Sequence, residues 1–158
     1  MVDDLAFFKA TAVYNSVSYS AYYTVDDLQD PYTAYTFSTV KEFKNSTGFG
    51  AVYTRVYRNG TEVDPIRSTT FSDTAPTSPS SGDFYYHLDT TNKTCVLKKY
   101  NGSSWSTATE TDSFTYKYYR IDKNGDPLDT TPYKTQRCIF VDPVIIDGQM
   151  QFVCEVFE

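Results

Sequence analysis

The stretch "AVYTRVYRNGTEVDP", residues 51–65, decides the fold class. The dipeptide Asn59-Gly60 separates two runs rich in Val, Tyr and Thr, and such a dipeptide is the strongest short-range signal for a β-hairpin. Before the turn, successive residues alternate in character, as they do in a strand with one buried face. We expect the even-numbered positions to point inward: Val52, Thr54 and Val56.

The rest of the chain repeats this pattern. The sequence holds 15 Tyr and 11 Phe, and aromatic and β-branched residues favour pleated, half-buried surfaces. Runs of these residues are separated by polar turns rich in Asn, Asp, Ser and Gly. Further strands are predicted at 6–14, 17–25, 32–40, 112–122, 134–143 and 149–158, with three short ones within 83–108. The chain is therefore predicted to be all-β.

The charge balance excludes some partners. The net charge is −6 and the sequence pI is about 4.7. Nucleic-acid binding usually needs a basic face, and so does docking on anionic lipid. We expect neither nucleic acid nor membrane as a partner. We expect the acidic charge to keep an exposed protein soluble.

The opening "MVDDLAFFKA" has two aspartates and lacks the basic region and long apolar core of a secretory signal. No apolar run approaches the roughly 18 residues of a membrane span. We expect a chain that is made and used without an export signal of its own.

The three cysteines, Cys95, Cys138 and Cys154, lack the short spacing of a zinc or redox motif. Strand alternation favours burial of Ile139 and Val141, which would point Cys138 outward, whereas Cys154 would point inward. We therefore expect no disulfide between Cys138 and Cys154, and Cys154 as a small buried apolar residue.

Two segments carry a resemblance. They are "DDLQDPYTAYTFSTVKEFKNSTGFGAVYTRVYRNGTEVDP" (26–65) and "YKYYRIDKNGDPLD" with "KTQRCIFVDPVIIDGQMQFVCEV" (within 116–156). Together they resemble the opening and closing strands of immunoglobulin-like domains of bacteriophage tail and baseplate proteins. The resemblance implies an antiparallel β-sandwich whose first half is 26–71 and whose second half is 111–158.

One residue departs from that family pattern. Tyr118 stands where such domains usually carry a core tryptophan, so packing at the sandwich centre is expected to differ. In that architecture Phe114, Tyr116 and Tyr118 would face inward, and a buried tyrosine hydroxyl would need a hydrogen-bond partner.

The middle and the start of the chain are predicted to be additions to the sandwich. "APTSPSSGDFYYHLDTTNKTCVLKKYNGSSWSTA" (75–108) is similar to a module that recurs in phage tail and fibre proteins. It implies a small inserted β-meander over 72–110. Residues 1–25 are predicted to be two strands that form a docking segment. The predicted fold class is an all-β, immunoglobulin-like antiparallel β-sandwich with an inserted small β-meander.

Catalysis and metal binding have weak signals. His87 is the single histidine, and Asp89 shares its face through strand alternation alone, with no nucleophile in evidence. The acidic stretch 122–126 resembles the start of a calcium loop but lacks its later ligands, and 26–30 is a second carboxylate-rich stretch. We expect no catalytic residue, no metal site and no cofactor.

The aromatic residues of the meander have two interpretations. They could present rings to a host-surface glycan or another partner, or they could hold together a meander of about thirty residues that has little core of its own. Packing is the simpler explanation. The candidate contact residues are Tyr85, Tyr86, His87, Tyr100 and Trp105.

These features favour a non-enzymatic structural or decoration protein of a bacteriophage virion. It would be assembled in the host cytoplasm and dock on a tail, baseplate, neck or capsid surface, with other virion proteins as partners in symmetric copies. Residues 1–25 and the terminal "EVFE" would be docking edges, because an unpaired strand edge accepts another chain. The alternative is a carbohydrate-binding adhesion module.

Overall fold

The computed structural model describes residues 5–14, 17–26, 32–111, 113–146 and 148–158. Within these ranges the chain forms twelve strands and no helix, so the all-β class is confirmed. The chain divides into two compact units, Met1–Thr33 and Ala34–Glu158, and each is described by itself.

The first unit is a β-hairpin. Strands β1 (Leu5–Tyr14) and β2 (Val17–Asp26) pair antiparallel, from Leu5 opposite Asp26 to Tyr14 opposite Val17. These bounds confirm the two strands predicted at 6–14 and 17–25. The sequence places Asn15 and Ser16 between the two strands, as a predicted turn, and these two residues lie outside the described ranges.

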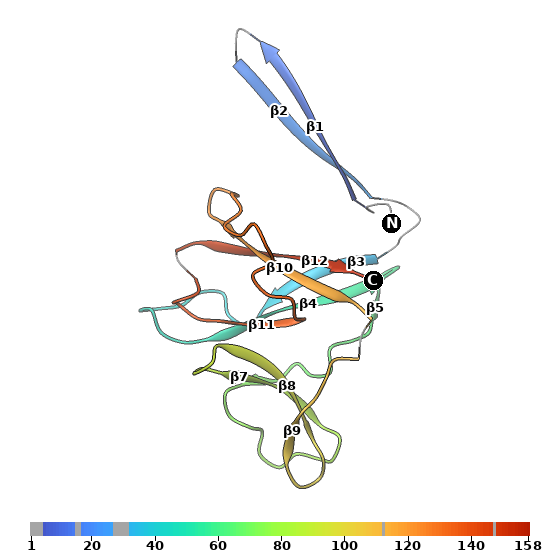
Figure 1. Ribbon diagram of the computed structural model, residues 1–158, viewed down its shortest axis with the longest axis vertical. Coiled ribbons are helices and arrows are strands. Elements are labelled where there is room, and N and C mark those ends of the chain that lie inside the picture. Colours follow the sequence, from blue (N-terminus) through green and yellow to red (C-terminus); the bar gives the residue numbers. More distant parts are fainter. Residues whose placement is uncertain (1–4, 15–16, 27–31, 112, 147) are drawn as a thin grey trace. The chain divides into compact units, whose positions relative to one another are not determined.

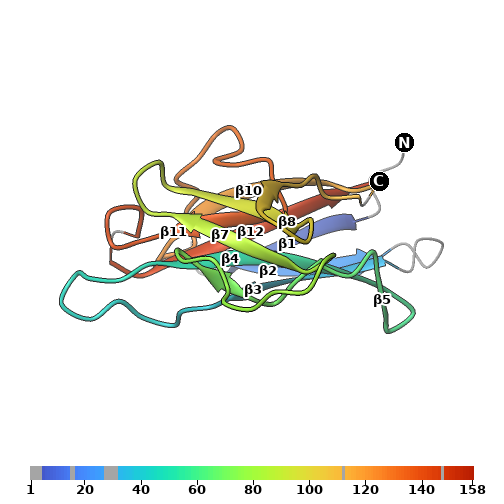
Figure 2. The same cartoon turned by 90° about the horizontal axis from the view of Figure 1, so that it is seen from below.

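The second unit contains three sheets (Figures 1 and 2). The central sheet has the order β11-β4-β3, with β5 paired to β4; the second is the pair β10-β12; the third has the order β6-β7-β8-β9. The strands of the central sheet are β3 (Tyr32–Ser38), β4 (Gly50–Arg58), β5 (Thr61–Val63) and β11 (Cys138–Val141). The others are β6 (Phe71–Ser72), β7 (Phe84–Asp89), β8 (Thr94–Tyr100), β9 (Trp105–Thr107), β10 (Thr115–Asp122) and β12 (Met150–Phe157).

The hairpin signal of the central sheet is confirmed. Asn59 and Gly60 both have positive φ, 50° and 78°, as a type I′ turn requires. Strands β4 and β5 pair around this turn with Arg58 opposite Thr61. The even-numbered residues of β4 are buried as predicted: Val52, Thr54 and Val56.

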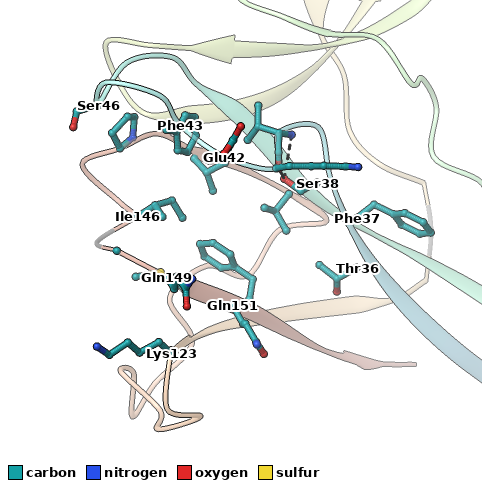
Figure 3. A pocket seen from close by; sticks show the side chains of 18 residues that line it. Thr36, Phe37, Ser38, Glu42, Phe43, Ser46, Lys123, Ile146, Gln149 and Gln151 are labelled. Carbon is teal, nitrogen blue, oxygen red and sulfur yellow. Dashed lines mark hydrogen bonds between the residues drawn. The ribbon is translucent and has the colours of Figure 1, made fainter.

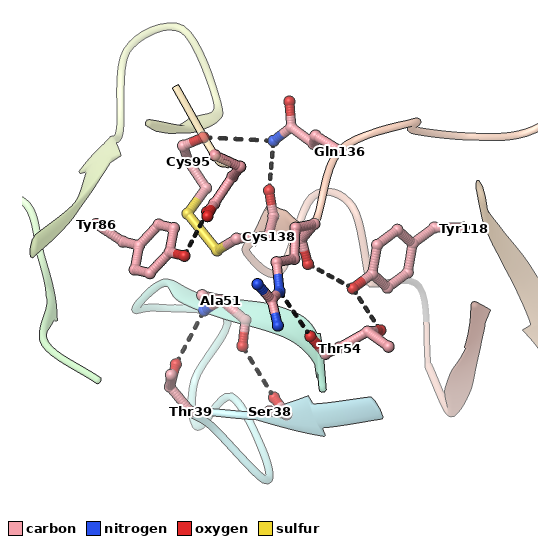
Figure 4. The surroundings of a disulfide bond; sticks show 11 residues. Ser38, Thr39, Ala51, Thr54, Tyr86, Cys95, Tyr118, Gln136 and Cys138 are labelled. Carbon is pink, nitrogen blue, oxygen red and sulfur yellow. Dashed lines mark hydrogen bonds between the residues drawn. A yellow bond between two sulfur atoms is a disulfide. The ribbon is translucent and has the colours of Figure 1, made fainter. Parts of the chain in front are cut away.

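Tyr118 joins the central sheet to the β10-β12 pair. Its side chain is fully buried, at 0% exposure. Its hydroxyl lies 2.7 Å from Thr54 Oγ1 and donates to the carbonyl oxygen of Arg137 at 2.8 Å (Figure 4). Burial raises the pKa of this phenol well above its ordinary value. The expectation of an inward tyrosine with a hydrogen-bonded hydroxyl is confirmed, and Tyr116 is buried beside it while Phe114 is half-buried.

Side-chain exposure alternates along β12, and Cys154 lies on its less exposed face, as predicted. The less exposed positions include Phe152, Cys154 and Val156, and the exposed ones include Val153 and Glu155. The two sheets joined by Tyr118 thus pack face to face, which is consistent with a β-sandwich.

The third sheet covers the other face of the central sheet, so the second unit has three layers. The rings of Tyr53, Phe71 and Tyr86 stack in series across this boundary, with centroids 4.9 Å and 5.1 Å apart. The core cluster here consists of Ala51, Tyr86, Leu88, Cys95, Leu97, Cys138 and Phe140. The three predicted short strands of 83–108 are confirmed as β7, β8 and β9. Strand β6, which runs parallel to β7, was not predicted.

A disulfide crosses the same boundary. Cys95 of β8 is bonded to Cys138 of β11, with Cα atoms 6.0 Å apart (Figure 4). The prediction that Cys138 points outward is wrong, because the third sheet covers that face and leaves Cys138 only 4% exposed. Ile139 and Val141 are buried as predicted, on the opposite face of β11. The expectation of no bond between Cys138 and Cys154 is confirmed, since the Cys154 thiol is free.

An ion pair ties the same two sheets together. Lys93, in the turn between β7 and β8, places its Nζ 2.6 Å from a carboxylate oxygen of the buried Asp142. The other carboxylate oxygen accepts the backbone N–H groups of Val144 and Ile145, each at 3.0 Å. Burial by itself would raise the pKa of Asp142, but the hydrogen bond from Lys93 and the two N–H groups outweigh it and lower the pKa.

The charge of Asp142 is therefore expected to stabilise the fold in a pH-dependent way. Because the folded pKa lies below the unfolded value of about 3.9, the contribution is present above about pH 4 and is lost as pH falls through the folded pKa. The Asp142→Asn variant keeps an oxygen for the two N–H groups, but it removes the charge and the oxygen that accepts from Lys93. We expect it to lower the free energy of unfolding by about 1 kcal/mol near neutral pH, with a difference from wild type that shrinks in acid.

Urea unfolding at several pH values measures this difference. The matched control is Glu42→Gln, because Glu42 pairs with Lys44 at 3.2 Å while both side chains are largely exposed, and such pairs contribute little. A difference for Asp142→Asn that stayed constant down to acid pH would contradict the assignment.

Candidate functional site

The aromatic residues of the third sheet divide between its two faces. Tyr100 lies directly opposite Trp105 in the β8-β9 pairing. Tyr85 and His87 share that face of the sheet, whereas Tyr86 lies on the other. The register therefore gathers four of the five predicted contact residues on the outer face.

Trp105 is the centre of the outer group. Its ring centroid lies 4.7 Å from that of Tyr85, edge to face, and 5.2 Å from that of Tyr100. Edge-to-face ring pairs at this spacing stabilise one another beyond the area that they bury. Tyr85 is only 3% exposed, and burial raises the pKa of its hydroxyl. The His87 ring stands at the edge of the group, 6.0 Å from Tyr85.

Tyr86 belongs to the core instead. It is 2% exposed, and its hydroxyl donates to the Glu110 carboxylate. Burial, followed by this contact with Glu110, raises its pKa. Neither Tyr85 nor Tyr86 offers a ring face to a ligand in this structure. The partly exposed members of the predicted set are His87, Tyr100 and Trp105.

A tight turn holds Trp105 in place. Asn101 Oδ1 accepts the backbone N–H groups of Ser103 and Ser104 at 3.0 Å and 2.9 Å. Gly102 has φ of 98°, a conformation that a residue with a side chain rarely adopts. The turn and Trp105 form an edge with exposed serine side chains beside a partly exposed ring. The serine hydroxyls of this edge can donate hydrogen bonds to a ligand, and the Trp105 ring can pack against an apolar face of that ligand.

The acidic residues singled out by sequence serve the turns. The Asp89 carboxylate accepts the backbone N–H groups of Thr91 and Asn92, at 2.9 Å and 2.8 Å. Asp122 does the same for Asn124 and Asp126. Hydrogen bonds of this kind lower the pKa of Asp89 and of Asp122.

No group of three or more metal-ligating side chains converges in the part of the chain that the structure describes. Most of the carboxylate-rich stretch 26–30 lies outside the described residues.

A groove opens at the end of the second unit, between β3 and β12 (Figure 3). Its volume is about 1070 Å³, and exposed polar residues such as Glu42, Ser46 and Gln149 line its rim. Apolar residues make up much of the remaining wall: Phe37, Val40, Phe43, Ile146, Met150 and Phe152. Sequence reasoning missed this groove because its walls come from segments more than a hundred residues apart.

Two unpaired strand edges flank the groove. Among the described residues, β3 pairs only with β4, and β12 pairs only with β10. The far edge of β10 is occupied, because Tyr118 donates its N–H to the carbonyl of Lys134 at 2.8 Å and Leu128 donates to Arg120 at 2.9 Å. The β10-β12 pair is thus closed on one side and open along β12.

The sequence matches no protein-family model, and comparison with curated proteins and with solved structures finds no match. No helix of the described residues is long and apolar enough to cross a membrane. The fold and the candidate site define an all-β protein with three packed layers, an aromatic edge on the outer sheet and an open groove between two strand edges.

Proposed function

We propose that this protein is a non-enzymatic structural or decoration protein of a bacteriophage virion, which docks on a larger assembly and exposes an immunoglobulin-like domain. The observation that carries the proposal is the groove flanked by the edges of β3 and β12, which have no strand partner among the described residues. Unpaired edges are binding surfaces for further strands, and natural proteins normally cover or interrupt them.

Two further features support this role. The segments 26–65 and 116–156, which resemble phage tail and baseplate domains, supply the sheets that pack through Tyr118. The Cys95–Cys138 disulfide is compatible with a particle that is released from cells, because disulfides persist in oxidising surroundings. Its partners would be other virion proteins on a tail, baseplate, neck or capsid surface, present in symmetric copies.

The test is to locate the protein in particles. Virions from infected cells are banded by density, and an antibody against the folded protein is applied for immunogold electron microscopy. We expect the intact chain to band with the particles and the gold to label one position on them regularly. Particles that lack the chain would refute the proposal.

A carbohydrate-binding adhesion module is the second candidate, favoured by the partly exposed Trp105 and Tyr100 beside the serine turn. Under the structural role we expect no specific signal on a glycan array. We also expect the Trp105→Ala variant to lose about 1–2 kcal/mol of stability, because Trp105 packs on Tyr85.

The matched control is Ser103→Ala, which changes the same edge without touching the ring pair. Specific glycan binding by wild type that Trp105→Ala abolishes while the protein stays folded would establish the adhesion role instead.

A further inference from the structure

The pairing register of the N-terminal hairpin separates its residues by character. Because strand residues alternate between faces and paired residues share a face, the register assigns ten positions to one face, all of them Ala, Val, Phe or Tyr. They are Ala6, Phe8, Ala10, Ala12, Tyr14, Val17, Tyr19, Ala21, Tyr23 and Val25. The other face is mixed. It carries the polar residues Lys9, Thr11, Ser18, Ser20, Thr24 and Asp26 together with Leu5, Phe7, Val13 and Tyr22.

A two-stranded hairpin by itself is marginally stable in water and needs a third strand or a packing partner. The face formed by the ten Ala, Val, Phe and Tyr positions has the composition expected of a sheet face that is buried against a partner. The groove between β3 and β12 has the complementary properties: an apolar wall, and beside it the unpaired backbone edge of β12.

Length and charge fit this pairing. Strands β1 and β2 have 10 residues each, and β12 has 8, so the hairpin can cover the whole edge. One Lys and one Asp cancel within residues 5–26, whereas the chain carries −6. Two copies repel each other through their net charge, and the neutral hairpin is the segment best able to approach the second copy.

The area is sufficient for a stable dimer. A 10-residue hairpin is about 33 Å long and about 10 Å wide, so one face covers roughly 330 Å². Consider a dimer in which the hairpin of each copy covers the groove of the other, which gives two such contacts. Counting the surface of both partners at each contact, the dimer buries about 1300 Å². Specific interfaces begin near 1,200 Å² of total buried surface.

We propose that the β1-β2 hairpin of one copy adds to the free β12 edge of a second copy, with its apolar face over the groove. The inference names the first partner of the assembly proposed above and rests on that proposal. Main-chain hydrogen bonds along β12 would supply affinity, and the apolar positions would select the register. Reciprocal exchange closes a dimer, and one-way exchange around a ring gives larger symmetric assemblies.

Sedimentation analysis of the full chain and two matched variants tests the proposal. Tyr23→Lys places a charge on the apolar face, and Thr24→Lys places the same charge one residue away on the mixed face. We expect wild type and Thr24→Lys to be oligomers. We expect Tyr23→Lys to be a monomer, with self-association weakened at least about 100-fold, because burying an unpaired ammonium is costly.

Mixing distinguishes exchange between copies from a hairpin that folds onto its own chain. Met150→Lys places a charge in the groove and leaves the hairpin intact, so it should also be monomeric alone. Mixed with Tyr23→Lys, it should form heterodimers that hold one intact junction. Backbone hydrogen exchange should show β12 protected in the wild-type oligomer and less protected in both variants.

A monomeric wild type, or an oligomer that Tyr23→Lys and Thr24→Lys weaken equally, would overturn the exchange. If Tyr23→Lys does not fold, the deciding measurement is backbone hydrogen exchange of β12 in the wild-type oligomer. Rapid exchange of the β12 amides there would refute the proposal. A monomer that still labels virions would refute hairpin exchange alone, whereas an oligomer absent from virions would refute the virion role alone.

Discussion

Replacing both Cys95 and Cys138 with Ala is expected to lower the free energy of unfolding by about 4 kcal/mol. The bridge joins residues 43 positions apart, and in the chain-entropy account a loop of that length restricts the unfolded state by about this amount. The effect is large because the bridge crosses from the outer sheet to the central sheet and lies within the small buried cluster between them.

Urea unfolding with and without a reductant measures this effect. Wild type under reducing conditions should match the double variant, whose own stability should not respond to reductant. Cys154→Ser is the matched control, because Cys154 forms no bridge and its substitution leaves the reductant response intact. A double variant as stable as oxidised wild type would contradict the expectation.

Reduction of the Cys95–Cys138 disulfide should also lower the hydrogen-exchange protection of some sheets more than others. Backbone amides of β7, β8 and β9 are expected to exchange faster after reduction, whereas those of β4 and β10 keep more of their protection, because Tyr118 still joins the latter sheets. Local opening of this kind reports which elements share a cooperative unit. Equal acceleration in all sheets would show that the bridge stabilises the second unit as a whole.

The variant Tyr118→Phe, which removes one hydroxyl oxygen from the centre of the sandwich, is expected to have the second large effect on the free energy of unfolding. Tyr118→Phe leaves the Thr54 hydroxyl and the Arg137 carbonyl without the phenol that bonds them at 2.7 Å and 2.8 Å. Because these groups are buried, we expect a loss of about 2 kcal/mol. Tyr118→Ala should cost about 3–5 kcal/mol, because it also leaves a cavity.

Chemical denaturation of Tyr118→Phe, Thr54→Val and the double variant completes the measurement. The double variant should lose less than the sum of the single losses, because each single change removes the same hydrogen bond. Tyr119→Phe is the control, since the neighbouring tyrosine lies on the more exposed face of β10. Additive losses would mean that the two hydroxyls do not depend on each other.

The same geometry shows why a tyrosine suits position 118. A tryptophan there would have a donor but no hydroxyl, and its larger ring would overfill a site that is fully buried. The phenol instead reaches two polar groups of the central sheet. The tyrosine was visible in the sequence, but its partners Thr54 and Arg137, 64 and 19 residues away, were not.

Alternation also failed at a specific place. In β11 it pointed Ile139 and Val141 inward, which is correct, and left Cys138 for solvent, which is wrong. The rule assumes one buried face, and the central sheet has two. At the meander, the sequence grouped Tyr85 and Tyr86 as candidate contacts, although adjacent strand residues lie on opposite faces, so alternation could already have separated them.

The sequence by itself determined the strands other than β6, the Asn59-Gly60 turn and the inward faces of β4 and β12, because turn chemistry and side-chain alternation are local properties of the backbone. Only the tertiary structure decided the Cys95–Cys138 bridge, the Lys93–Asp142 ion pair and the groove between β3 and β12. Each of these depends on which sheet covers which face and which edge stays open. Those outcomes are set by contacts between residues far apart in the chain, which no local pattern encodes.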